Sequence, residues 1–128
     1  MFVSNKEKHP WFQLELPEER MIHTVTIYNR EDMLGEKLHD VEIRAGFDDA
    51  NEGKYPLSDI NKHCYFYKGP GKTGETIICK CADGPIEAKY LTVQIIAAEP
   101  EWLQIREIDL IIDDCRGDLS GKYNIIAK

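Results

Sequence analysis

The sequence has no long apolar run and no segment in which apolar residues keep a helical period over three turns. A membrane span needs about 20 mainly apolar residues in succession, so we expect no insertion into a membrane. Basic charge is also scarce: 16 basic residues against 23 acidic ones give a net charge of −7, and the basic residues are scattered. Nucleic acids and anionic membrane surfaces are therefore not expected as partners.

Spacings typical of metal sites and catalytic groups are absent as well. Cys79-x-Cys81 is too tight for a zinc knuckle, and the histidines, at positions 9, 23, 39 and 63, show no ligand spacing. The stretch KGPGKTGE at 68–75 is no phosphate loop, because Phe66 stands where that motif requires glycine. We predict a hairpin turn there, and we expect that the protein is not an enzyme.

Cysteine, in contrast, is frequent for a cytosolic domain, with residues at positions 64, 79, 81 and 115. The residues alone leave disulfides, metal binding and free thiols open. Disulfides are favoured, and they indicate an oxidising compartment. The first residues, MFVSNKEKHP, contain no apolar core of a signal peptide. We therefore expect a secreted, extracellular protein whose true N-terminus lies upstream of this chain.

Short runs of alternating polarity fill most of the chain. We predict strands at FQLEL (12–16), VTIYN (25–29), VEIRAG (41–46), TIICK (76–80), YLTVQI (90–95) and EIDLII (107–112). Alternation with β-branched residues is typical of strands with one buried face, and so indicates an all-β sandwich or barrel. The pattern changes phase between Ile105 and Ile108, which predicts a bulge or a crossing between sheets. The expected core comprises Val25, Ile27, Val41, Ile43, Leu91, Val93 and Leu110.

A chain of 128 residues is long enough for one domain with a real core. We place this domain at 1–112, with a long surface loop at 48–63. A polar tail, 113–128, follows it, and its composition is compatible with disorder. The tail contains Arg116-Gly117-Asp118, an integrin-type tripeptide of a kind that often arises by chance.

The stretch YNREDMLGEKL at 28–38 mixes charged and apolar residues where a strand should end. A neutral sugar needs a fan of hydrogen-bond donors, which Arg30 and Lys37 supply, while Asp32 can hold the guanidinium in place. Met33 and Leu34 offer a small apolar platform for the methyl group of a deoxysugar. The alternative is an ordinary charged turn in which Met33 and Leu34 are tucked into the core.

Together with the strands around it, this stretch resembles the F-type lectins, the fucolectin family of fucose-binding, discoidin-like β-sandwiches. The resemblance runs from about Phe2 to Ile112, and Arg30-x-Asp32-x4-Lys37 matches the second half of the family's sugar motif. It implies an antiparallel jelly-roll sandwich and an extracellular lectin for terminal fucose or a related sugar. Fucosylated glycans are then the expected partners, and a homo-oligomer is compatible with the resemblance.

The chain departs from the family pattern in its site. Val3 falls at the position of the family's sugar-contacting histidine, and Met33-Leu34 replaces two adjacent cysteines. The family's first strands and most of its calcium-binding loop have no counterpart here. Glu107 alone falls on a calcium position, so the resemblance implies an incomplete calcium site.

The cysteines also compare with the family. The resemblance pairs Cys64 with Cys81. A second family disulfide would join the positions of Met1 and Arg106, and neither is cysteine. Cys79 and Cys115 have no counterpart.

A second function stays open beside the lectin. A discoidin-like adhesion domain that has lost sugar binding would bind protein, for instance through residues 116–118. Val3 favours this alternative, whereas Arg30, Asp32 and Lys37 favour the lectin.

Overall fold

The computed structural model describes residues 2–52, 60–113 and 119–126, and these residues form strands and two short 3-10 helices. All the strand pairs described are antiparallel, which confirms the predicted all-β fold class. The strands are β1 (Phe2–Val3), β2 (Trp11–Tyr28), β3 (Val41–Gly46), β4 (Lys62–Tyr67), β5 (Thr76–Lys80), β6 (Ile86–Ile95), β7 (Gln104–Ile105), β8 (Glu107–Asp113) and β9 (Leu119–Ile126); the 3-10 helices are η1 (Gly35–Lys37) and η2 (Ala50–Glu52).

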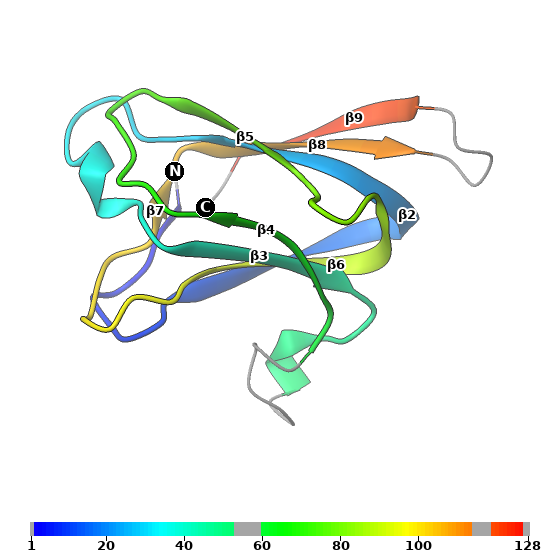
Figure 1. The fold of residues 1–128 in the computed structure, drawn as a ribbon, viewed down its shortest axis with the longest axis horizontal. Helices are drawn as coiled ribbons and strands as arrows, with labels where there is room; N and C mark the ends of the chain where they lie inside the picture. The colour runs from blue at the N-terminus through cyan, green and yellow to red at the C-terminus, as the bar shows by residue number, and fades with distance from the viewer. Residues whose placement is uncertain (1, 53–59, 114–118, 127–128) are drawn as a thin grey trace.

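Strand β2, with 18 residues, belongs to both layers of the sandwich. Its first part pairs with β6, beside β3 and β4, and its last part lies between β5 and β8. The register with β6 is interrupted between Glu15 and Arg20, where Pro17 has no N–H to donate to a ladder. Figure 1 shows the strand turning there from the lower layer into the upper one. The two strands predicted at 12–16 and 25–29 are therefore parts of one bent strand.

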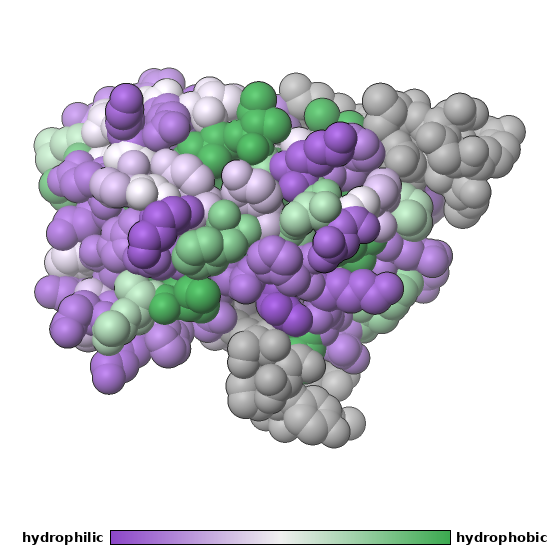
Figure 2. All heavy atoms as spheres, in the orientation of Figure 1, coloured by the Kyte–Doolittle hydropathy of each residue, from purple (hydrophilic) through white to green (hydrophobic). Residues whose placement is uncertain are grey.

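The space between the layers is filled by the inward faces of the strands. All seven residues predicted as core have no exposed surface: Val25, Ile27, Val41, Ile43, Leu91, Val93 and Leu110. Figure 2 shows the outside of one face as mainly polar, with apolar residues in small separate groups. Among the described residues, no helix is long and apolar enough to span a membrane.

The phase change between Ile105 and Ile108 is a crossing between sheets. Strand β7 pairs with β1 in a separate two-stranded sheet, and β8, which starts two residues later, pairs with β2. Because Ile105 and Ile108 are both fully buried, the chain has to change phase at Arg106 to keep both inside. The Arg106 N–H donates to the Tyr28 carbonyl at 2.9 Å, which ties the crossing to the end of β2.

Two predicted irregular segments contain strands. Strand β4 starts inside the loop predicted at 48–63. The sequence analysis did not predict this strand, because KHCYFY has only one fully buried side chain, Cys64, and so shows little alternation. Strand β9, at Leu119–Ile126, pairs with β8 inside the segment predicted as a polar tail. Residues 119–126 are therefore part of the sheet, although their composition is compatible with disorder. The domain boundary at 112 stays a prediction. Cys115 and the tripeptide 116–118 lie outside the described residues.

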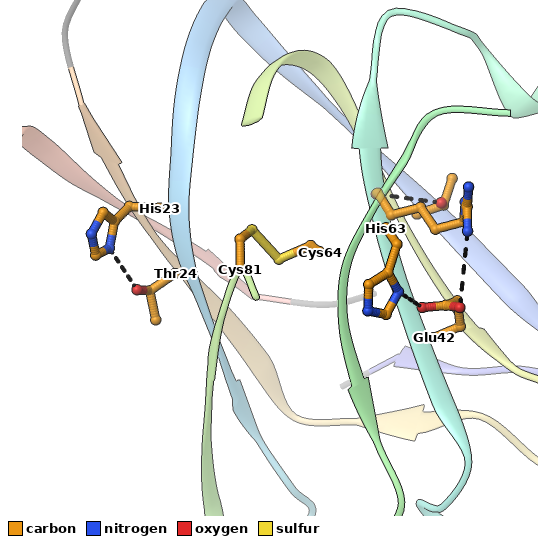
Figure 3. Close-up of a disulfide and its surroundings, with 8 residues drawn as sticks. His23, Thr24, Glu42, His63, Cys64 and Cys81 are labelled. Carbon is orange, nitrogen blue, oxygen red and sulfur yellow. Dashed lines mark hydrogen bonds and ion pairs between the residues drawn. A yellow bond between two sulfur atoms is a disulfide. The ribbon is translucent and has the colours of Figure 1, made fainter. Parts of the chain in front are cut away.

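The predicted disulfide between Cys64 and Cys81 is present (Figure 3). It joins β4 to the residue that follows β5, and the Ala82 N–H donates to the Cys64 carbonyl beside it at 2.7 Å. Cys79 is a free, fully buried thiol. Burial raises the pKa of Cys79 to about 12, so the thiolate needed for exchange with the neighbouring disulfide is scarce.

We predict that removing the disulfide lowers the free energy of unfolding by about 3 kcal/mol, because the bond closes a loop of 17 residues in the unfolded chain. The double variant Cys64→Ala/Cys81→Ala tests this by urea unfolding with and without a reducing agent. The wild type should lose stability in the reducing agent, whereas the variant should not respond to it. Equal stability of the oxidised wild type and the variant would contradict the prediction.

Candidate functional site

The Arg30 guanidinium is held on two sides. Its Nε and Nη2 each donate to one carboxylate oxygen of Asp32 at 2.6 Å, and Nη1 donates to Oε1 of Gln104. The Asp32 carboxylate also accepts from the Met33 N–H at 2.9 Å. A guanidinium has five N–H groups, so these contacts leave two for a ligand. Only 13% of the Arg30 side chain is exposed, which makes it less exposed than its position in a loop suggests.

This pair also fixes the charges of the site. The hydrogen bonds from Arg30 hold the pKa of the Asp32 carboxyl well below its usual range. The same hydrogen bonds raise the pKa of Arg30. Both groups therefore stay charged in any physiological solution, and the planar fork keeps its orientation.

Met33 and Leu34 project outward beside Asp32, with 58% and 42% of their surfaces exposed. The alternative in which both are tucked into the core is therefore wrong. Leu34 adopts a left-handed conformation, with φ of 59°, at the start of η1. This turn keeps two apolar side chains in water, an arrangement that costs free energy unless something covers them.

Lys37, at the other end of the loop, faces the segment before β7. Its Nζ lies 4.0 Å from Oε1 of Glu101 and 5.5 Å from the centre of the Trp102 ring. Both predicted cations thus contact one short segment, Arg30 through Gln104 and Lys37 through Glu101 and Trp102. Glu101, Trp102 and Gln104 are residues that the sequence analysis did not identify.

Asn29 organises the loop from below, and its role was also missed. It is 1% exposed, and its Nδ2 donates to the carbonyls of Gly35 at 2.8 Å and Lys72 at 3.0 Å. Its Oδ1 accepts from the Arg30 N–H at 2.9 Å. The segment 68–75 therefore supports the Arg30 loop. It is not the predicted hairpin turn, because β4 pairs with β3 while β5 pairs with β2. The signal was an asparagine directly after a strand, a position where its amide can hold backbone groups.

Gly35 allows this close approach of two loops. A Cβ at this position would lie 2.4 Å from the Thr73 backbone nitrogen, so any other residue would push the loops apart. The Gly35 N–H donates to the Thr73 hydroxyl at 3.1 Å, and the Gly74 N–H donates to the Arg30 carbonyl at 2.8 Å. The two loops form one unit.

Val3 lies next to this unit. In the β1–β7 ladder it pairs with Gln104, the residue that accepts from Arg30. Directly opposed residues of an antiparallel pair share a face, so Val3 shares a face with Gln104, whose side chain accepts from Arg30. The position implied by the resemblance is thus near the site, and it holds an apolar residue that is 49% exposed.

Glu107 does not stand among carboxylates. One of its oxygens accepts from Nη1 of Arg106 at 3.0 Å, and Nη2 of Arg106 lies 3.4 Å from Glu31. In the described part of the chain, no three His, Cys, Asp or Glu side chains are grouped so as to hold a metal ion. The calcium that the resemblance implies stays a prediction.

Curated relatives align with most of this chain. It is 31% identical over 102 residues to fucolectin-1 of Anguilla japonica, which covers 80% of the chain and 52% of that protein. It is 29% identical over 115 residues to a pentraxin fusion protein of Xenopus laevis, covering 90% of the chain and 26% of that protein. The chain therefore spans about half or less of these relatives. No protein-family profile matches it.

Solved structures share the fold. A fucolectin from the serum of the striped bass, Morone saxatilis, superposes with a TM-score of 0.71 at 21% identity, covering 84% of this chain and 34% of that one. The lectin domain of lectinolysin, solved with Lewis B antigen, superposes with a TM-score of 0.60 at 20% identity, covering 87% and 70%. Fold and relatives together define a β-sandwich of the fucolectin type. In sequence and in fold the chain is similar to the F-type lectins.

We predict that Asn29→Ala lowers the free energy of unfolding by about 2–3 kcal/mol, because buried carbonyls at 35 and 72 and the Arg30 N–H lose their partner. Asn29→Asp should be no better, since a carboxylate cannot donate. Urea unfolding measures both changes. Asn5→Ala, at an exposed asparagine, is the control and should change stability by less than about 0.5 kcal/mol.

His39 stands between two carboxylates beside this site. Its Nδ1 lies 2.9 Å from Oδ2 of Asp40, and its Nε2 lies 3.0 Å from Oε2 of Glu101. Burial lowers the pKa of His39, but the two carboxylates raise it by more, so the net shift is upward. Hydrogen bonds from His39 lower the pKa of Asp40, and they also lower the pKa of Glu101 against the opposing effect of its burial.

We predict that His39 stabilises the fold mainly at acidic to neutral pH. A raised folded-state pKa gives stability that is complete below the unfolded value of about 6.5 and is lost as pH rises through the folded value. The stability difference between wild type and His39→Gln should therefore shrink from about pH 6 to about pH 9 in urea unfolding. A difference that grows over this range would contradict the prediction.

Proposed function

We propose that this chain is a non-catalytic carbohydrate-binding module that recognises terminal fucose or a closely related deoxysugar. The observation that carries the proposal is the fork of Arg30. It is fixed by Asp32 and Gln104, keeps two N–H groups for a ligand, and stands beside the exposed pair Met33 and Leu34. A fixed donor next to an apolar step fits a sugar that has hydroxyls on one side and a methyl group on the other.

In this proposal each group has a distinct task. Arg30 and Lys37 donate to the hydroxyls and ring oxygen of the sugar, and Asp32 orients Arg30. Met33 and Leu34 pack against the methyl edge, so that covering them adds to the binding free energy. A donor held in place before binding loses little further entropy on binding, which favours affinity in a small, shallow site.

The relatives support the choice of sugar. Two of them are named fucolectins, and related folds include a fucose-binding module of Streptococcus pneumoniae and a lectin domain solved with Lewis B antigen. We propose fucosylated glycans as partners of the present chain. We also propose an extracellular location, which the buried disulfide and the serum source of the striped bass lectin support.

Arg30→Lys should weaken binding of methyl α-L-fucoside by about ten- to a hundred-fold, because lysine keeps the charge but loses the two-pronged contact with Asp32. The measurement is an NMR shift titration, which reads affinities in the millimolar range. The melting temperature should fall only slightly, because the loop is supported through Asn29.

Arg20→Lys is the matched control, since Arg20 lies on β2 and pairs with Glu18. It should leave sugar affinity unchanged. Val3→His places a new donor next to Gln104 and Arg30, and should strengthen binding. Failure of wild type and Val3→His to bind the fucoside, with both folded, would refute the proposed function.

Val3 also favours a second candidate, a discoidin-like adhesion domain that binds protein. An exposed valine stands where a donor to the sugar is expected. A cell-adhesion assay separates the two functions. Adhesion that is lost in Asp118→Glu and unchanged in Arg30→Lys would support the protein-binding function.

A further inference from the structure

Trp102 and Gln104 lie on the same face of the segment that precedes the sheet crossing. Leu103 and Ile105 between and after them are fully buried. Since side chains alternate along an extended chain, Trp102 and Gln104 point the other way, toward the loop that carries Arg30 and Lys37. The contacts agree: Gln104 accepts from Arg30, and the Trp102 ring lies 5.5 Å from Nζ of Lys37.

The N-terminal segment borders the other side of Trp102. The Ser4 N–H donates to the Leu103 carbonyl at 2.9 Å, and the Glu7 N–H donates to the Glu101 carbonyl at 3.2 Å. This pairing brings Nζ of Lys6 to 4.9 Å from the centre of the Trp102 ring. Two ammonium groups thus lie near one partly exposed indole, and one of these, on Lys37, already belongs to the proposed sugar site.

We propose that Trp102, with Lys6 and Lys37, forms a second subsite, which takes the neutral sugar linked to the terminal deoxysugar. This inference rests on the proposed function. It extends the ligand from a monosaccharide to a fucosylated disaccharide or longer glycan.

The chemistry of this subsite matches a hydroxylated ring. The indole offers an apolar surface for the C–H side of a pyranose, and Lys6 and Lys37 donate to hydroxyls at its edge. Lys6 is exposed, so its stem can move aside while its ammonium stays near the ring. The Glu101 carboxylate, 4.0 Å from Nζ of Lys37, holds the shared donor between the two subsites.

The spacing also fits. Trp102 and Gln104 are two residues apart, or about 6.6 Å along an extended chain. This is comparable with the step between neighbouring rings of an oligosaccharide. A sugar held by Arg30 over Gln104 therefore has its neighbour within reach of Trp102.

The test compares the affinities for methyl α-L-fucoside and for a fucosylgalactose disaccharide by NMR titration. Wild type should bind the disaccharide about five- to ten-fold more tightly than the fucoside, because it adds one aromatic contact and its hydrogen bonds. Trp102→Ala should bring this ratio close to unity, because it removes the contact that only the disaccharide makes. Lys6→Ala should lower the ratio partly, whereas Lys89→Ala, a lysine on β6, should not change it.

Each contrary outcome has a distinct meaning. If Trp102→Ala weakens both ligands by the same factor, Trp102 only positions Lys37 and the subsite is overturned. If wild type binds the fucoside but gains nothing from the second sugar, the subsite fails while the proposed function stands. If wild type binds neither ligand, the proposed function fails and the subsite fails with it.

A spectroscopic reading does not depend on affinity ratios. The chain has two tryptophans, so its indole N–H region holds two signals, and Trp102→Phe assigns them. The disaccharide should shift the Trp102 signal more than the fucoside does at equal saturation, with Trp11 as the internal reference. Equal shifts of the Trp102 signal with both ligands would overturn the subsite.

Discussion

The amide of Asn29 is the interaction on which the candidate site depends. β2 ends one residue before Asn29. The Asn29 side chain donates to the Gly35 carbonyl in its own loop and to the Lys72 carbonyl, 43 residues further along the chain. Buried amide donors and acceptors have to be paired, so the arrangement is close to all or none. The core fixes the position of β2, and Asn29 at its end in turn fixes the position of the Arg30 backbone. A loop exposed to solvent acquires the geometry of the sheet below it.

Electrostatics then act on a backbone that is already placed. The Arg30 guanidinium donates to both Asp32 and Gln104. Glu101 pairs with both His39 and Lys37. Most of these groups are partly exposed, and exposed ion pairs contribute little to stability. Their effect is on orientation: they select one direction for each donor. Burial of apolar side chains in the core stabilises the fold, whereas the charged groups orient the side chains of the site.

Much of the fold could be predicted because strands with one buried face leave a direct trace in the sequence. Val25 with Ile27 and Val41 with Ile43 alternate with polar residues, and all four are fully buried. The crossing at Arg106 was visible for the same reason, as a change of phase. The continuity of β2 was hidden by Pro17 and its acidic neighbours, because the bend makes one strand look like two. β4 was hidden because its alternation is weak.

The site was predicted in part: contacts between residues close in sequence could be predicted, and contacts between residues far apart could not. Arg30 and Asp32 are two residues apart, so their pairing follows from local reach. Gln104 and Trp102 contact the loop only because the fold brings them there, so no local pattern predicts them. Asn29 did have a local signal, its position directly after a strand, which the sequence analysis did not use. The resemblance to a known family indicated that Val3 falls at a position of the sugar site. The physical reason for this is the β1–β7 ladder, which pairs Val3 with Gln104.

The Arg30–Gln104 contact spans 74 residues of chain, and this separation has a consequence for biosynthesis. A ribosome adds about 5–20 residues per second, so Gln104 is made roughly 4–15 s after Arg30. During that interval the guanidinium has Asp32 but lacks its second anchor, and the strand β7 that carries Gln104 does not yet exist. The loop is thus synthesised well before its contact with Gln104 can form. Met33 and Leu34, which lie in the same loop, are therefore also made several seconds before the site can present a finished surface to a ligand.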